Sequence, residues 1–179
     1  MAGQAKVNVG GVWRQVKNIF ANVGGVWRQV KYSYANVGGV WRSAYQAIYA
    51  LFTAGVQNVP YTLDVGSYGT VTNTGSSLSI YGCGDDRHGS SVYIRWNVDV
   101  TGYKTFKVDM DFTIVQGGGS CLVGTSSSYT IISTSRSRST VNFDLTGLTG
   151  VQYLQIYFSS NHSTGSDTVT GNVYNVWLE

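Results

Sequence analysis

The sequence Asn-Val-Gly-Gly-Val-Trp-Arg occupies residues 8–14 and returns unchanged at residues 22–28 and 36–42. The copies start 14 residues apart, a period too short for a solenoid or propeller repeat, so a local backbone unit must explain it. Gly-Gly between apolar residues is typical of a two-residue type I′ hairpin turn, which needs positive φ at both positions. Further turns at Lys17-Asn18 and Lys31-Tyr32 would complete the period. The repeats therefore predict an N-terminal antiparallel β-meander.

The register of this meander makes one face a ladder of alternating Trp and Asn. Trp13 lies opposite Asn22, Asn22 opposite Trp27, Trp27 opposite Asn36, and Asn36 opposite Trp41. The other face is mainly valine, so both faces are apolar, and such cross-strand pairs stabilise a sheet. We expect these Trp and Asn residues to serve packing or assembly, against the rest of the chain or against other copies. Stacking of exposed Trp on sugar rings is the alternative.

Composition favours an all-β chain. Strand formers dominate, helix formers are sparse, and the 179 residues include 23 Gly and one Pro. The N-terminus lacks the apolar segment of a signal peptide, and no apolar run is long enough to span a membrane. Cys83 and Cys121 are the only cysteines, and two unpaired thiols on strands are favoured over a bridge.

Charge is unevenly distributed. Residues 1–63 contain six basic and no acidic residues, whereas residues 64–179 contain six basic and nine acidic residues, a net of −3. A basic end could meet an anionic polymer such as nucleic acid or teichoic acid. Copying of one Lys and one Arg per repeat explains the same charge, and no nucleic-acid-binding motif is present. We therefore predict neither a nucleic-acid nor a membrane partner.

The repeat region is expected to cover residues 1–52, with residues 43–52 forming either a longer strand or a short helix. Beyond Pro60, strands at roughly ten-residue spacing predict a jelly-roll-like β-sandwich over residues 60–179. The expected strands cover 68–73, 77–81, 91–99, 103–115, 120–124, 128–133, 139–145, 152–158 and 167–178. Alternation places apolar side chains inward at even positions from Val92 to Val98 and from Phe106 to Ile114.

Asp109 and Asp111 are the best carboxylate pair in the chain. On one face of a strand they lie about 7 Å apart at the backbone, within the separation used by inverting glycosidases. However, Lys107 and Thr113 share that face, and a solvated alternating face produces the same spacing without any function. No other suitable acid is present, so we predict no catalytic residue and no enzyme.

Three polar loops supply candidate ligand-binding residues. The most charged loop contains Asp85, Asp86, Arg87 and His88, whose spacing matches no zinc or EF-hand pattern. Arg136 and Arg138 are expected on one side of an extended segment, where an Arg pair suits a carboxylate or phosphate group, as in an anionic glycan. Asn161 and His162 fall in a turn-forming run. Solvated loops are the plain alternative for all three, and no cofactor or metal site is predicted.

The repeat resembles a known kind of protein. Residues 7–17, Val-Asn-Val-Gly-Gly-Val-Trp-Arg-Gln-Val-Lys, are similar to tandem repeats in tail and baseplate proteins of phages and prophages of Gram-positive bacteria. There a phrase such as Val-Asn-Gly-Val-Trp-Lys recurs beside a β-sandwich. Residues 144–150 and 173–178 are similar to the jelly-roll modules that end such proteins. The extra Val-Gly departs from the family pattern, and the resemblance carries no binding residues to positions here.

This resemblance implies a non-enzymatic virion protein, assembled in the host cytoplasm, whose sandwich recognises a cell-surface carbohydrate and whose repeats serve assembly. Because phage adhesion devices are commonly trimeric, a homotrimer is expected. Two other classes remain open. The chain would be a carbohydrate-binding accessory module if the reading frame continued into a cell-wall hydrolase, and a purely structural assembly protein if it bound no glycan.

Overall fold

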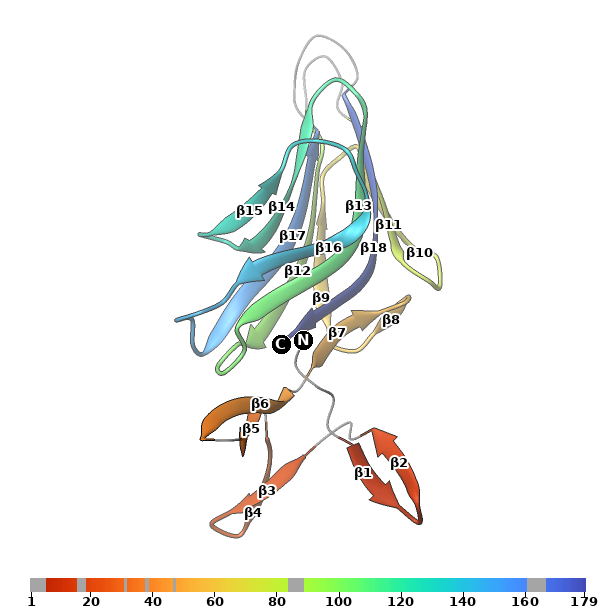
Figure 1. The fold of residues 1–179 in the computed structure, drawn as a ribbon. Coiled ribbons are helices and arrows are strands. Elements are labelled where there is room, and N and C mark those ends of the chain that lie inside the picture. The colour runs from red at the N-terminus through yellow and green to blue at the C-terminus, as the bar shows by residue number, and fades with distance from the viewer. Residues whose placement is uncertain are drawn as a thin grey trace. The chain divides into compact units, whose positions relative to one another are not determined.

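The computed structural model describes residues 6–15, 19–30, 32–37, 39–46, 48–83, 89–160 and 167–179. Within these ranges every regular element is a β-strand, which confirms the predicted all-β class (Figure 1). The chain divides into two compact units, residues 1–49 and residues 50–178. No helix among the described residues is long and apolar enough to cross a membrane.

The first unit consists of three antiparallel hairpins, one for each repeat. They are β1 (Lys6–Val9) with β2 (Val12–Gln15), β3 (Phe20–Val23) with β4 (Val26–Gln29), and β5 (Tyr32–Val37) with β6 (Val40–Gln46). The Gly-Gly turns have the expected positive φ, 63° at Gly24 and 83° at Gly25, and the first hairpin is alike. The predicted Gly-Gly turns of the first two repeats are therefore confirmed, whereas Gly38 of the third lies outside the described residues.

The Asn of each repeat closes its own turn. The Oδ1 atoms of Asn8, Asn22 and Asn36 each accept the backbone N–H of the residue three positions on, at 2.9 Å. The register also places Asn22 opposite Trp27 and Asn36 opposite Trp41, as predicted. This local closure explains why Asn precedes every Val-Gly-Gly.

The predicted pairing between successive hairpins is not found. Among the described residues each hairpin is a separate two-stranded sheet, so Trp13 does not pair with Asn22, nor Trp27 with Asn36. The expected turn at Lys17-Asn18 lies outside the described residues. The physical reason is that Gly-Gly adopts positive φ at no steric cost, whereas Lys-Asn has no comparable preference. The sequence therefore encodes each hairpin, but no ladder between hairpins.

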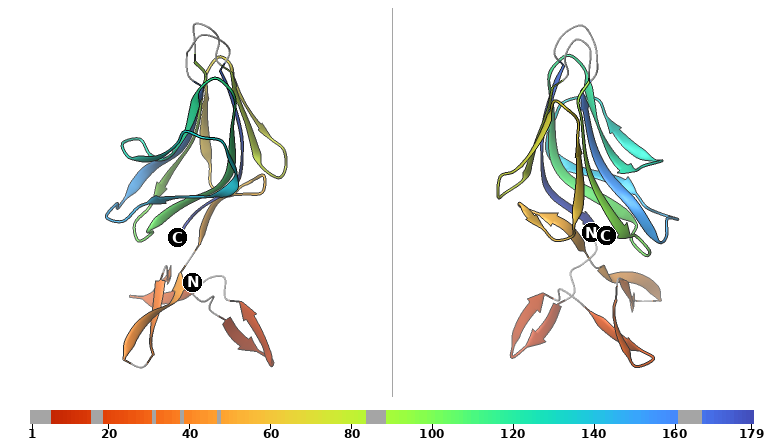
Figure 2. Two further views of the ribbon diagram at one scale, coloured as in Figure 1. Left: turned by 45° about the horizontal axis from the view of Figure 1, so that its top comes forward. Right: turned by 180° about the vertical axis from the view of Figure 1, so that it is seen from behind.

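The second unit is the predicted β-sandwich of two antiparallel sheets, shown from two further sides in Figure 2. The first sheet has the order β10 (Gly69–Asn73), β11 (Leu78–Cys83), β18 (Thr168–Leu178), β13 (Thr105–Gln116), β16 (Arg136–Asp144), and β7 (Tyr49–Thr53) pairs with both β18 and β8 (Val56–Gln57). The second sheet has the order β15 (Tyr129–Ile132), β14 (Gly119–Thr125), β17 (Val151–Ser160), β12 (Ser91–Asp99), β9 (Tyr61–Val65).

The core lies between these sheets, where the alternation predicted it. Every even position from Val92 to Val98 and from Phe106 to Phe112 is buried, and Ile114 is partly buried against the core. These two strands therefore bury the faces that their sequences indicate, and a strand is found at each of the nine expected places. Residues 43–52 form parts of two strands rather than a helix. Leu51 and Phe52 are fully buried in the sandwich core. The second unit therefore begins at Ala50, within the stretch assigned above to the repeats.

Two irregularities in the first sheet shape its outer face. Opposite Asp109 and Met110, β18 carries one extra residue, Tyr174. On the other side of β13, Met110 pairs with Ser139 of β16 and Phe112 pairs with Arg136. Two residue steps along β13 therefore lie opposite three steps along β16. Such bulges redirect side chains locally, and both lie beside the candidate site.

Candidate functional site

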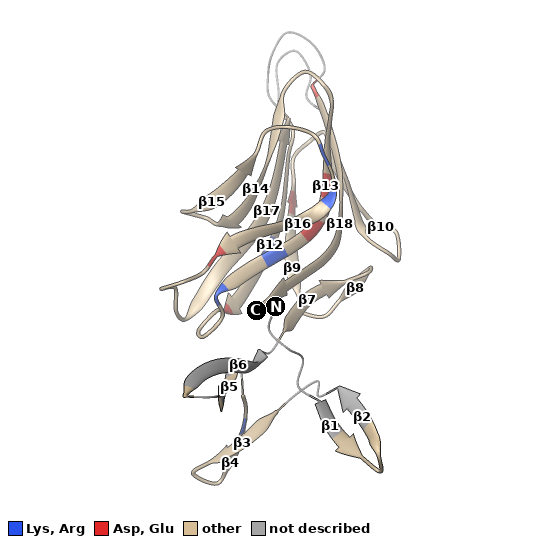
Figure 3. Ribbon diagram, in the orientation of Figure 1, with Lys and Arg blue, Asp and Glu red and all other residues tan. Residues whose placement is uncertain are grey.

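The outer face of β13, β16 and β18 carries a network of polar side chains joined by hydrogen bonds. We call it the polar face and define it by Asp109, Asp111, Arg138, Asn172 and Tyr174. Figure 3 shows that acidic and basic positions of the second unit gather on β13 and β16. Because β13 pairs with β18 on one side and with β16 on the other, residues far apart in sequence meet here.

Arg138 and Asp109 form the first part of the site. Arg138 Nε donates to Asp109 Oδ1 at 3.1 Å, and Nη2 donates to Oδ2 at 2.7 Å. Asn175 Nδ2 also donates to Oδ2, at 2.9 Å. The Arg138 guanidinium therefore holds the pKa of Asp109 below its usual range. A two-pronged contact of this kind fixes both side chains in orientation.

Asp111 and Tyr174 form the second part. The Tyr174 hydroxyl donates to Asp111 Oδ2 at 2.7 Å, which raises the pKa of the phenol. Asn172 donates to Asp111 from its backbone N–H at 2.9 Å and from Nδ2 at 3.1 and 3.2 Å. The Tyr174 ring also lies 3.8 Å from the Arg138 guanidinium carbon, within reach of a cation–π contact. Tyr174, the bulge residue, thus contacts both Asp111 and the Arg138 that binds Asp109.

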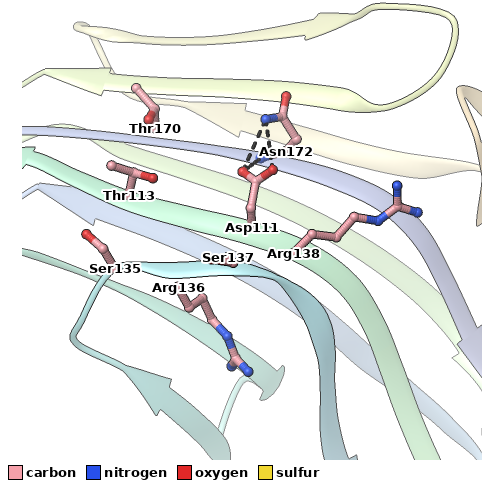
Figure 4. Close-up of a pocket in the computed structure, with 8 residues that line it drawn as sticks. All are labelled: Asp111, Thr113, Ser135, Arg136, Ser137, Arg138, Thr170 and Asn172. Carbon is pink, nitrogen blue, oxygen red and sulfur yellow. Dashed lines mark hydrogen bonds between the residues drawn. The ribbon is translucent and has the colours of Figure 1, made fainter.

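An open pocket of about 540 Å³ lies in this face (Figure 4). Its lining is polar throughout and comprises Asp111, Thr113, Ser135, Arg136, Ser137, Arg138, Thr170 and Asn172. Figure 4 shows Asp111 turned toward Asn172 and the hydroxyl side chains of Ser135, Thr113 and Thr170 around it. The pocket volume suits a small ligand or part of a chain.

The predicted pair of arginines is brought to one pocket, but the two do not point the same way. Figure 4 shows the side chains of Arg136 and Arg138 pointing in different directions. Arg136 lies opposite the buried Phe112, and its Nε donates to Ser139 Oγ at 3.0 Å. The expectation of one shared side is wrong because the bulge in β16 breaks the strict alternation between these residues. Both arginines line the pocket, but Arg138 bonds Asp109 whereas Arg136 bonds Ser139.

Several predicted site residues fall elsewhere. Asp85, Asp86, Arg87 and His88 lie outside the described residues, as do Asn161 and His162. Of the repeat tryptophans, Trp27 is 68% exposed, and the side chains of Trp13 and Trp41 are outside the described part. Asn22 and Asn36 are exposed.

Sequence reasoning missed Asn172, Tyr174 and Asn175. Their strand was predicted, but its two neighbours in the sheet were not, and only that pairing sets these side chains beside the carboxylates. The signal in the sequence was the polar Asn172 and Asn175 among the apolar residues that end this strand. That signal alone does not distinguish an outward face from a binding site.

The chemistry of the site favours binding over catalysis. Both carboxylates already accept hydrogen bonds from protein donors, and the lowered pKa of Asp109 is the opposite of what a general acid needs. No three His, Cys, Asp or Glu residues of the described part are grouped closely enough to hold a metal ion. Cys121 is a free, buried thiol, and burial raises its pKa.

No family model matches the chain, and no curated protein matches it either. Solved structures of similar fold include a variant of a family 29 carbohydrate-binding module, with 18% identity over 74% of this chain and 90% of that one, at a TM-score of 0.46. TmCBM61, solved in complex with β-1,4-galactotriose, has 12% identity over 67% of this chain and 88% of its own, at 0.43. The agarase AgWH50C has 12% identity over 75% of this chain but only 25% of its own length, at 0.48.

Proposed function

We propose that the chain is a non-enzymatic virion protein of a phage or prophage of Gram-positive bacteria. In this proposal the β-sandwich binds a host-surface carbohydrate at the polar face, and the hairpin repeats serve assembly. The observation that carries the binding role is the ordered network of Arg138, Asp109, Tyr174, Asp111 and Asn172 beside an open polar pocket.

Carbohydrate is the ligand class that this lining suits. Sugar hydroxyls both donate and accept hydrogen bonds, and the pocket offers carboxylate acceptors, guanidinium donors, an amide and several hydroxyls that do both. The network already holds Asp111 and Arg138 in place, so little side-chain entropy is lost when a ligand binds. A purely apolar ligand would displace water from the polar lining without replacing its hydrogen bonds, at a cost of about 1–3 kcal/mol for each group left unsatisfied.

The assembly role rests on the repeats. The hairpin β3–β4 exposes Val23 and Val26 on one face and Phe20 and Trp27 on the other, all by more than half of their surface. A two-stranded hairpin alone is at best marginally stable in water, so apolar contacts on both faces favour association. The repeat resemblance and the common trimeric state of phage adhesion devices support a homotrimer. A monomeric mass by analytical ultracentrifugation at micromolar concentration would contradict it.

The binding role is tested with the full chain on purified Gram-positive cell walls and on a glycan array. We expect binding to wall glycan that is reduced at least tenfold by Asp111→Ala, and also by Thr113→Trp, which fills the pocket from an exposed position without removing a network hydrogen bond. Asp144→Ala is the matched control, because it lies on the same sheet about 20 Å along the strands. Equal binding by all four proteins, or by none, would refute the proposal.

The virion role has its own test, mass spectrometry of purified particles. The chain should be a stoichiometric component. Its absence, together with a reading frame that continues into a cell-wall hydrolase, would replace the virion role by that of an accessory module. Its presence without any glycan binding would leave a purely structural protein.

A further inference from the structure

The outer face of the second sheet has a different character from the polar face. One row of outward side chains crosses all its strands in register, from β9 to β15: Asp64, Tyr93, Tyr157, Leu122 and Ile131. We call this surface the tyrosine face. The strands β14, β15 and β17 contain no Asp, Glu, Lys or Arg at all. In contrast, β13 and β16 hold six such residues.

The rings of this face are packed against one another. Tyr93 and Tyr157 stack at 4.1 Å between centroids with 21° between their planes. The Arg95 guanidinium lies 4.0 Å from the centre of the Tyr93 ring. Tyr93 therefore has a ring on one side and a guanidinium close by, so it has little free ring surface for a sugar. A glycan-stacking platform is not what this arrangement offers.

The face nevertheless exposes a large apolar area. Ile131 is 61% exposed, Tyr153 59% and Tyr129 45%, and all three side chains belong to the second sheet. Centres of protein–protein interfaces are depleted in charge and enriched in Tyr. The composition of this face is therefore typical of a surface that contacts another protein.

The charged residues of this face indicate which kind of protein partner it fits. Beside the stacked tyrosines the face carries one cation and one anion, Arg95 and Asp64, in a single 3.6 Å contact. A second acid, Asp99, lies at the far end of β12. The Asp64 side chain remains 66% exposed, so it retains capacity for a second cation. This pair of opposite charges is complementary to itself, because a two-fold axis placed between them sets each Arg95 against the partner's Asp64.

We infer that the tyrosine face is the contact surface for a second copy of this chain, packed sheet against sheet about a two-fold axis. The face measures about 24 Å across five strands of about 4.8 Å and about 23 Å along strands of about seven residues. This gives about 550 Å² for each copy and about 1,100 Å² in total, near the lower limit for a specific interface. The contact is therefore weak, and its occupancy depends on protein concentration.

The test is sedimentation of the full chain over a concentration series. Ile131→Asp introduces a charge at the apolar, β15 end of the row. Val115→Asp is the matched control, since Val115 is equally exposed, at 60%, but lies on β13 of the first sheet. At high concentration we expect wild type and Val115→Asp to reach twice the mass of Ile131→Asp, whatever state the repeats impose. Equal masses for all three proteins at every concentration would overturn the inference.

A charge exchange tests the pairing of Arg95 with Asp64 directly. In Arg95→Asp the pair becomes two acids, and in Asp64→Arg it becomes two bases, so each variant alone should lose the doubled mass. Mixing the two variants should restore it, because unlike faces now attract. If the mixture stays as small as its components, the proposed two-fold contact is wrong. Cell-wall binding of each variant is measured in parallel, and its retention separates this inference from the function of the polar face.

Discussion

Tyr174→Phe isolates the hydrogen bond that ties the bulge residue to Asp111. The substitution removes the hydroxyl that donates to Asp111 Oδ2 at 2.7 Å and keeps the ring beside the Arg138 guanidinium at 3.8 Å. A hydrogen bond to a charged acceptor contributes about 1.5–3 kcal/mol. Asp111 keeps its bonds from Asn172, and the site is partly solvated, so we expect the lower end. The sandwich should lose about 1.5 kcal/mol of unfolding free energy, or about 3–6 °C in Tm.

The assay is urea unfolding followed by tryptophan fluorescence, with Asp111→Ala and the double variant completing a cycle. We expect a coupling energy of about 1 kcal/mol between Tyr174 and Asp111. Tyr153→Phe is the control, because that side chain is 59% exposed and should change stability by less than about 0.5 kcal/mol. If Tyr174→Phe behaves like this control and the coupling is zero, the network does not hold the site in place, and the argument from preorganisation fails.

Three further predictions concern acid stability, the core and the repeats. Arg138 lowers the folded-state pKa of Asp109. The stability that this carboxylate contributes is therefore present above its unfolded pKa of about 3.9 and is lost as pH falls through the folded value. Between pH 5 and pH 2, urea unfolding should show a larger fall in unfolding free energy for wild type than for Asp109→Asn. Phe112→Ala empties a fully buried site packed against Phe158 at 5.9 Å, and should cost about 3–5 kcal/mol by the same urea assay; a cost below that of an exposed substitution would refute the core assignment. Gly25→Val places a β-branched residue at φ 83° and should abolish the cross-strand NOEs of β3–β4; unchanged NOEs would show that the turn tolerates a side chain.

The parts of the fold that were predictable are those encoded by neighbouring residues. Alternation in residues 106–112 identified both the strand and its buried face, because a period of two is a property of the strand alone. The Gly-Gly turns were predictable because their positive φ also depends only on neighbouring residues. The strand Tyr61–Val65 was missed. It is an edge strand that exposes Leu63 and Val65, so its sequence lacks the clear alternation of buried apolar and exposed polar residues.

The parts that were not predictable depend on which strands become neighbours. Asp109 and Asp111 were recognised as a pair, but their donors Asn175 and Tyr174 come from a strand more than sixty positions away. The bulges at Tyr174 and in β16 decide which side chains reach the polar face. A bulge leaves no mark in the hydrophobic pattern when the residues around it are polar, as in Ser135 to Ser139.

Each repeat hairpin is closed entirely by its own residues, from the Asn that accepts the turn N–H to the Gly pair that makes the bend. A deletion or duplication of one whole repeat therefore removes or adds one complete hairpin without altering the turn or register of those that remain. The number of hairpins can vary among related chains, or be set by an engineer, as an integer. Gain or loss of a whole 14-residue unit would change that integer in single steps, and every product would retain intact hairpins ahead of an unchanged sandwich.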